Sequence, residues 1–185
     1  SSDLSVLGSQ IKQAGSLVCA DYLRFDFNHL NALTKDEIEK IENLINQKIL
    51  ENIPTNIFNT SLDDAKTKGI ISFFGEKYNP ENVRVVQIPG FSAELCGGTH
   101  ASATGIIGAF KIISDTALSA GTRRLTAVTG PEAIKLFQQS FATSKKLGEL
   151  FKVKPEEVVG AVEKLQGQLQ TAQTEIKQLK KQLIK

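Results

Sequence analysis

The stretch Leu23-Arg24-Phe25-Asp26-Phe27 decides how the first part of this chain folds, because apolar and charged residues alternate along it. A period of two is typical of a strand with one buried face and one exposed face. We therefore predict a strand over residues 22–27. The chain has 185 residues, of which 41% are hydrophobic, and this is enough for one buried domain plus an appendage.

A helix is predicted directly after this strand. Thr34 and Glu37 have the spacing of a capping box, in which each side chain bonds the other residue's backbone N–H. Pro54 closes the helix. The apolar residues of its buried face follow at helical spacing: Ile38, Ile41, Ile45 and Ile49. A second strand is predicted over residues 83–88, which are rich in valine and end at Pro89-Gly90.

The apolar runs between Gly105 and Val128 are broken by Ser119-Ala120-Gly121. Runs this short do not distinguish helix from strand, so both remain open. Together with the predicted strands and helix they indicate an α+β body of mixed strands and helices, which we place at residues 1–130.

Residues 131–185 are predicted to be helical, as a helical hairpin or coiled coil. Apolar residues step by four and three along a heptad seam: Val158, Val162, Leu165, Leu169, Ala172, Ile176, Leu179 and Leu183. Such a seam indicates a long helix that packs along a partner helix. The short connection at residues 151–155 favours an antiparallel pairing with residues 132–150, and a dimer is the alternative. Pro155 suits the first turn of the long helix.

Composition limits the class of protein. The net charge is +2, which favours neither nucleic acid nor membrane, and no apolar run is long enough to cross a bilayer. Two cysteines are too few for a disulfide framework, and no secretion signal is present, so we expect a cytoplasmic protein in which Cys96 stays reduced. We expect Cys19 to be buried. The absence of Met suggests a piece of a longer protein.

The chemistry of the chain concentrates in Cys96-Gly97-Gly98-Thr99-His100, which follows the predicted strand 83–88. A thiolate and an imidazole four residues apart are half of a tetrahedral zinc site, which usually has four protein ligands, or three with a water. The chain has only one other His, His29, and only one other Cys, Cys19, so the remaining ligands are not identified from these residues. By itself the pair is also compatible with a buried thiol and an unrelated histidine.

Five sequence runs together resemble the editing domain of alanyl-tRNA synthetase, in that family's order. They are Gly15–Val18, Leu23–Phe27, Phe74–Tyr78, Phe91–His100 and Arg123–Gly130. The resemblance covers nearly the whole chain and includes the helical linker after the domain. It implies the second additional domain that threonyl- and alanyl-tRNA synthetases share. In this family the domain hydrolyses tRNA(Ala) wrongly charged with serine or glycine, and the parent enzyme uses ATP to attach alanine to tRNA(Ala) for protein biosynthesis.

The resemblance also implies roles for individual residues. Cys96 and His100 become zinc ligands, and the family carries two further ligands on a His-x-x-x-His helix that lies upstream of Ser1 in this numbering. We therefore expect residues 1–185 alone to bind zinc weakly and to be inactive. Gly97 and Gly98 are expected to let the substrate ester approach backbone N–H groups, while Thr99 and Gln13 are expected to act in catalysis by orienting ligand or substrate.

Partners follow from the same reasoning. Arg123 and Arg124 are expected to bind tRNA(Ala) phosphates, although an arginine pair on a strand serves equally well in structural ion pairs. The basic end of the long helix is more often only a solvated face. An alternative function is a non-catalytic tRNA-binding or assembly module with an incomplete metal site. No membrane partner is expected.

Overall fold

The computed structural model describes residues 7–8, 11–70 and 79–183. The chain forms two compact units, Ser1–Ile134 and Lys135–Lys185. The first contains two antiparallel sheets, and the second contains the helical tail. The predicted α+β class is therefore confirmed. The run Phe74–Tyr78, which contributed to the family resemblance, lies outside the described residues.

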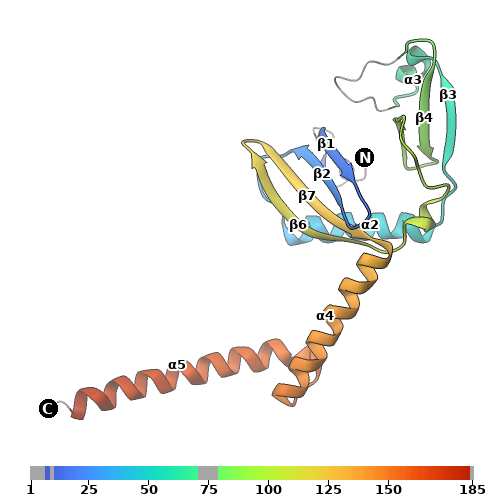
Figure 1. The fold of residues 1–185 in the computed structure, drawn as a ribbon. Coiled ribbons are helices and arrows are strands. Elements are labelled where there is room, and N and C mark those ends of the chain that lie inside the picture. Colours follow the sequence, from blue (N-terminus) through green and yellow to red (C-terminus); the bar gives the residue numbers. More distant parts are fainter. Residues whose placement is uncertain (1–6, 9–10, 71–78, 184–185) are drawn as a thin grey trace. The chain divides into compact units, whose positions relative to one another are not determined.

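A four-stranded antiparallel sheet is the larger of the two sheets in the first unit (Figure 1). Its order is β1 (Gln13–Val18), β2 (Leu23–Asn28), β7 (Thr122–Thr129) and β6 (Phe110–Ser119). The predicted strand 22–27 is thus β2, and it pairs with a strand about one hundred residues later in the chain. The undecided segment after Gly105 contains a short 3-10 helix, η1 (Thr104–Ile107), followed by β6 and β7, which Gly121 separates at a turn with positive φ.

Helix α2 (Lys35–Leu50) covers one face of this sheet. Its start is the predicted capping box, because Thr34 accepts from the backbone N–H of Glu37 and the Glu37 carboxylate accepts from the backbone N–H of Thr34. The apolar faces of helix and sheet meet in one core, whose buried members are Ile11, Phe27, Leu33, Ile41, Ile49, Phe110, Ile112, Leu125 and Ala127. Both the helix and its buried face were predicted correctly.

A three-stranded antiparallel sheet follows, in the order β3 (Asn56–Thr60), β4 (Val83–Ile88) and β5 (Ser92–Leu95). The predicted strand 83–88 is β4, whereas β3 and β5 were not predicted. Helix α3 (Leu62–Thr67), capped by the Ser61 hydroxyl, packs on this sheet. Together they bury a second, smaller core made of Ala65, Val83, Val85 and Leu95.

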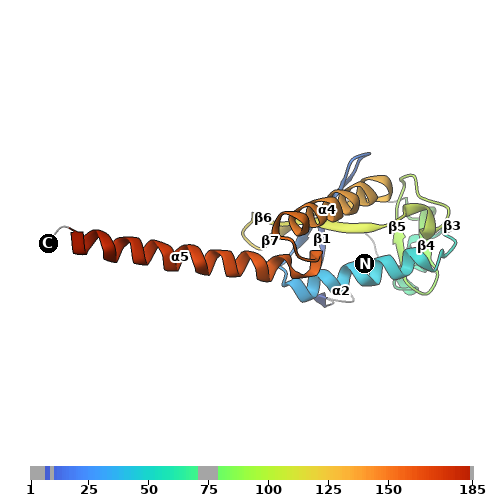
Figure 2. The ribbon, with the colours of Figure 1, turned by 90° about the horizontal axis from the view of Figure 1, so that it is seen from below.

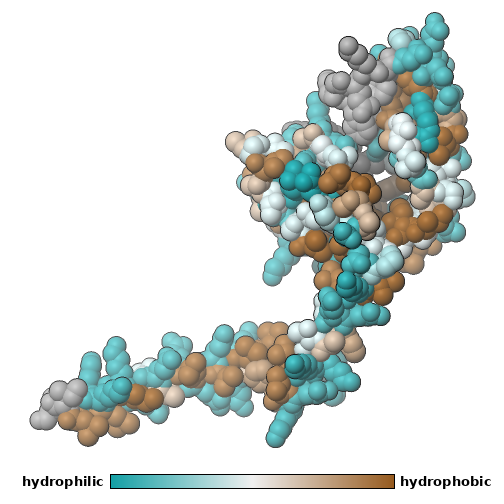
Figure 3. Space-filling model, in the orientation of Figure 1, coloured by the Kyte–Doolittle hydropathy of each residue, from teal (hydrophilic) through white to brown (hydrophobic). Residues whose placement is uncertain are grey.

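The second unit contains most of α4 (Gly130–Phe151), then η2 (Pro155–Glu157) and α5 (Val158–Leu183). Helix α5 is one unbroken helix with brown apolar side chains along its surface (Figures 2 and 3). Its seam residues Leu165, Leu169 and Ile176 are each more than half exposed. The predicted pairing with residues 132–150 within the chain is therefore not formed, because a packed hairpin would bury these side chains.

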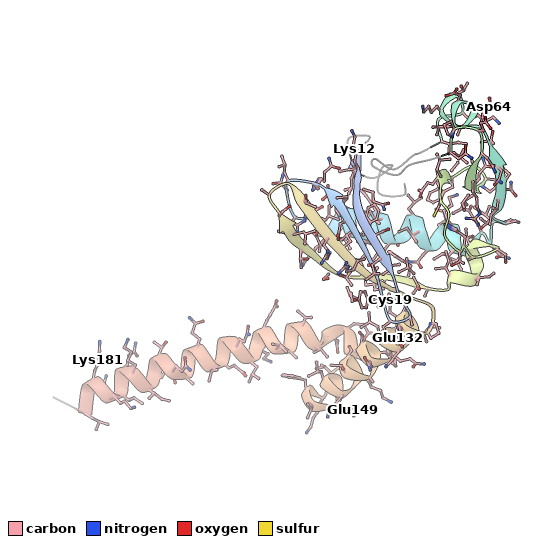
Figure 4. The ribbon with its side chains drawn as sticks, turned by 45° about the horizontal axis from the view of Figure 1, so that its top comes forward. Lys12, Cys19, Asp64, Glu132, Glu149 and Lys181 are labelled. Atoms are coloured by element: carbon pink, nitrogen blue, oxygen red, sulfur yellow. The ribbon has the colours of Figure 1, made fainter. Side chains whose placement is uncertain are left out.

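The structure also bears on the predictions for Cys19 and for membrane-spanning segments. Cys19 is exposed rather than buried, because it lies in the turn between β1 and β2, where its Sγ donates to the carbonyl of Tyr22 at 3.0 Å (Figure 4). Within the described residues, no helix combines the length and the apolar character that a membrane crossing requires.

Candidate functional site

The loop that follows β5 brings the two predicted zinc ligands together. A Cβ atom built on Gly98 would lie 3.6 Å from Sγ of Cys96 and 3.9 Å from Nε2 of His100. Both donor atoms therefore converge on the space that the missing side chain of Gly98 leaves free. The predicted role of Gly97 and Gly98, to let a substrate ester approach backbone N–H groups, stays a prediction.

The same loop is open on its other side. A Cβ atom on Gly97 would meet nothing within 4 Å, and Gly97, Gly98, Thr99 and His100 are exposed. Cys96 is half-buried, because Leu95 before it is packed in the second core. A molecule can thus reach the backbone of Gly97 and the side chain of Thr99 from solvent.

Arg84 on β4 holds the upstream end of the loop. Its Nη1 donates to the carbonyl of Cys96 at 2.7 Å and to the carbonyl of Gly98 at 2.7 Å. The backbone N–H of Cys96 also donates to the carbonyl of Arg84 at 3.2 Å. Sequence reasoning missed this residue, although a single charged side chain between Val83 and Val85 was a signal that the strand carries a specific polar contact.

Thr104 holds the downstream end. It is 3% exposed, its hydroxyl donates to the carbonyl of Lys48 at 2.6 Å, and the same oxygen accepts from the backbone N–H of Ile53 at 2.8 Å. The backbone carbonyl of Ser102, which lies closer to His100 in the sequence, accepts from the backbone N–H of Thr55 at 2.9 Å. The segment after His100 is therefore fixed to the end of α2 and the residues that follow it.

The Cys96 thiol and the His100 imidazole are of the kinds that bind zinc, but they are only two ligands. Thiolate and imidazole are the ligands zinc prefers, and a structural site needs four. Among the residues that the structure describes, no cluster of three or more His, Cys, Asp or Glu side chains has a metal-binding arrangement. Cys96 and His100 therefore fit half of a zinc site.

The two predicted tRNA-binding arginines lie on β7 and are both paired with carboxylates. Arg123 Nε donates to Asp115 Oδ1 at 2.7 Å, and both side chains are almost fully buried. Arg124 Nε and Nη2 donate to the two oxygens of Asp26 at 2.7 and 2.8 Å. This second pair lowers the pKa of the Asp26 carboxyl, chiefly through the hydrogen bond from Arg124. Of the two arginines, Arg123 is the one whose geometry more strongly supports a structural ion pair over a contact with tRNA, because its charged group is buried away from solvent.

Gln13, at the start of β1, is half-buried, and its side-chain amide donates to Oγ of Ser16 at 3.2 Å. It lies in the four-stranded sheet, whereas Thr99 lies in the loop after the three-stranded sheet. The structure thus assembles Cys96, Gly98 and His100 into one site, and it shows for Gln13 only its own local partner.

Comparison with known proteins gives a consistent result for this region. Residues 83–126 match the family described as threonyl and alanyl tRNA synthetase second additional domain. The match includes β4, the Cys96–His100 loop and β6, so the candidate site lies inside it.

The whole chain is similar to one segment of larger enzymes. It is 48% identical over 174 residues to an alanine--tRNA ligase of Oleidesulfovibrio alaskensis, a match that covers 94% of this chain and 20% of that enzyme. Alanine--tRNA ligases of Synechocystis sp. and Thermoanaerobacter sp. are 47% and 45% identical over 96% and 95% of this chain. The chain thus spans about one fifth of the length of the curated relatives it matches.

Proposed function

The chain belongs to the alanyl-tRNA synthetase family and corresponds to the segment that carries the second additional domain, and from this premise we propose that it is an editing module. Its reaction is hydrolysis of the ester that joins serine or glycine to tRNA(Ala). The protein that contains it attaches alanine to tRNA(Ala) using ATP. An active site sized for alanine cannot fully exclude glycine and discriminates poorly against serine, so a second, hydrolytic site corrects the errors.

One observation carries this proposal, namely the convergence of Cys96 Sγ and His100 Nε2 on the space beside Gly98. We propose that these two atoms hold zinc together with a His-x-x-x-His pair that the family carries upstream of Gly15. The bound ion would act as a Lewis acid for the amino group or for water. Residues 1–185 by themselves are then expected to bind zinc weakly.

The other loop residues have roles that follow from what ester hydrolysis needs. An aminoacyl ester is already activated, so catalysis requires mainly a positioned water and donors for the developing oxyanion. We assign the exposed backbone N–H groups of Gly97 and Gly98 to the ester oxygen and the hydroxyl of Thr99 to orientation of the substrate or of a ligand. Gln13 would hydrogen-bond the serine hydroxyl or the terminal ribose. A site that bonds the serine hydroxyl favours serine over alanine, because alanine leaves the polar groups of the site unpaired. This contact acts on serine alone, since glycine has no hydroxyl.

Contact with the tRNA backbone is the least direct part of the proposal. Arg124 retains N–H donors beyond the two that bond Asp26, and these can face a phosphate while the ion pair stays intact. For Arg123, buried against Asp115, a structural role is the simpler one.

The test uses the chain joined to the upstream His-pair helix of its relatives. Purified Ser-tRNA(Ala), Gly-tRNA(Ala) and Ala-tRNA(Ala) are each incubated with this protein, and release of the amino acid is followed over time. The expected result is hydrolysis of the first two only. Cys96→Ala or His100→Ala should lower the rate at least about 100-fold, the upper range for loss of a group that supports a metal ligand.

Cys19→Ala is the matched control, because Cys19 is also a free cysteine but is exposed in the turn between β1 and β2, outside the Cys96–His100 loop. Its rate should equal that of the unmodified protein. If the protein binds tRNA(Ala) and yet hydrolyses none of the three substrates, the editing proposal is wrong, and a non-catalytic tRNA-binding or assembly module is the better description.

A further inference from the structure

The Cys96–His100 loop has no regular secondary structure, so its shape depends on individual contacts. Arg84 supplies three of them: two hydrogen bonds from its side chain, to the carbonyls of Cys96 and Gly98, and one through its own carbonyl, which accepts from the N–H of Cys96.

These contacts act at the point where the two donor atoms are placed. The carbonyls that Arg84 bonds belong to the residues on either side of Gly97, and fixing both limits rotation of the backbone between Cys96 and Gly98. The orientation of the Cys96 side chain and the starting direction of the chain toward His100 depend on that backbone. Loss of the two bonds would therefore let Sγ and Nε2 move apart.

The backbone of Arg84 is held in the sheet. It lies on β4 between Val83 and Val85, which are 3% and 0% exposed in the second core, and it pairs with Asn59 of β3 across the sheet. Each terminal guanidinium nitrogen, such as Nη1, carries two N–H groups in a fixed plane, so this one nitrogen can serve two carbonyls at once. Its permanent charge makes both bonds stronger than those between neutral groups.

We infer that Arg84 is a positioning residue that holds the Cys96–His100 loop in the shape in which its two donors converge. The inference deepens the proposed function and rests on it for its consequence, namely that Arg84 supports metal binding without touching the metal. Hydrogen-bond partners of metal ligands typically contribute 10–100-fold in affinity.

The experiment has two readouts and four proteins: the unmodified chain, Arg84→Ala, Arg84→Lys and the control Asn59→Ala. Asn59 is exposed and lies directly opposite Arg84, so its removal changes the same sheet face without touching the loop. The first readout is the ¹⁵N order parameter of the Gly97 and Gly98 amides in the metal-free chain, which reports motion of the loop backbone directly. The second is Co²⁺ titration of each protein joined to the upstream His pair, followed by the thiolate-to-cobalt absorption.

The order parameters of Gly97 and Gly98 should fall from about 0.85 to below about 0.6 in Arg84→Ala, partly recover in Arg84→Lys, and stay unchanged in Asn59→Ala. Amides of the four-stranded sheet should have the same order parameters in all four proteins. Co²⁺ affinity should fall about 10-fold in Arg84→Ala, fall less in Arg84→Lys, and stay unchanged in Asn59→Ala. If Arg84→Ala does not fold, the same two measurements on Arg84→Lys, compared with the unmodified chain, test the inference.

Unchanged order parameters of Gly97 and Gly98 in the arginine variants would overturn the inference, and so would an equal Co²⁺ affinity in all four proteins. If the unmodified protein binds no Co²⁺, the metal part of the proposed function is wrong. The order parameters would in that case still decide whether Arg84 holds the loop.

Discussion

Replacing Thr104 by valine removes one hydroxyl and keeps the shape of the side chain, so it isolates what that hydroxyl contributes. The oxygen bonds two backbone groups, the carbonyl of Lys48 and the N–H of Ile53, in a place where Thr104 is only 3% exposed. Valine would leave both groups without their partner. A buried polar group left unsatisfied costs about 1–3 kcal/mol, so we expect a loss of about 2–3 kcal/mol in the free energy of unfolding of the first unit.

Urea unfolding followed by tyrosine fluorescence measures this loss. The chain has no Trp and two Tyr, and both tyrosines lie within Ser1–Ile134, so the signal reports the first unit and not the helical tail. With an m value of about 2 kcal/mol per molar urea, the midpoint should fall by about 1–1.5 M. Thr104→Ser keeps the hydroxyl and loses one methyl group, which costs about 0.8 kcal/mol. A midpoint for Thr104→Val within about 0.3 M of the unmodified chain, or equal to that of Thr104→Ser, would refute the reasoning.

Two further predictions concern the site and its neighbouring sheet. Gly98→Val should weaken Co²⁺ binding in the chain joined to the upstream His pair, because the valine side chain would fill the space between Cys96 Sγ and His100 Nε2. Gly97→Val is the control and should bind Co²⁺ as before, because a Cβ atom at residue 97 meets nothing within 4 Å. An equal loss of Co²⁺ affinity in the two variants would contradict this prediction. The hydrogen bond from Arg124 lowers the pKa of Asp26 below its ordinary value of 3.8. The Asp26–Arg124 pair therefore stabilises the folded state fully at pH values above 3.8, and this contribution is lost as the pH falls through the folded-state pKa. Urea midpoints measured from pH 7 to pH 3 should therefore fall less steeply at the acidic end in Asp26→Asn, and identical slopes would show that the pair makes no such contribution.

The parts of the fold that sequence predicted correctly are those whose signals are local. The alternation at Leu23–Phe27 follows directly from a strand with one buried face, and the Thr34–Glu37 box forms within one helical turn. Strand β5 was missed because four residues are too few for a clear period.

The heptad seam shows a different limit. A period of 3.5 residues indicates that α5 has an apolar stripe, and the structure has that stripe, but the period does not say where a partner lies. The short connection at residues 151–155 suggested residues 132–150, yet Leu165 and Leu169 remain exposed. Loop length limits how far apart two helices can start without making them pack.

The candidate site divides in the same way. Cys96 and His100 were identified because their spacing and glycines are visible within five residues. Arg84 and Thr104 were not, because the contacts that make them important join residues 12, 14 and 56 positions apart. The same is true of Arg124, whose partner Asp26 is 98 positions away, so sequence left its structural and tRNA-binding interpretations equally open.

The long-range contacts also bear on how a metal would act here. In small zinc domains the ion supplies much of the folding free energy, because the ligands have no other reason to meet. In this chain Leu95 is anchored in a buried core, Arg84 bonds two carbonyls of the loop, and Thr104 fixes the segment after it. Protein contacts already bring the two donors together, so ordering the loop costs less when an ion binds. We therefore expect zinc at this site to contribute to the chemistry of ester hydrolysis more than to the stability of the fold.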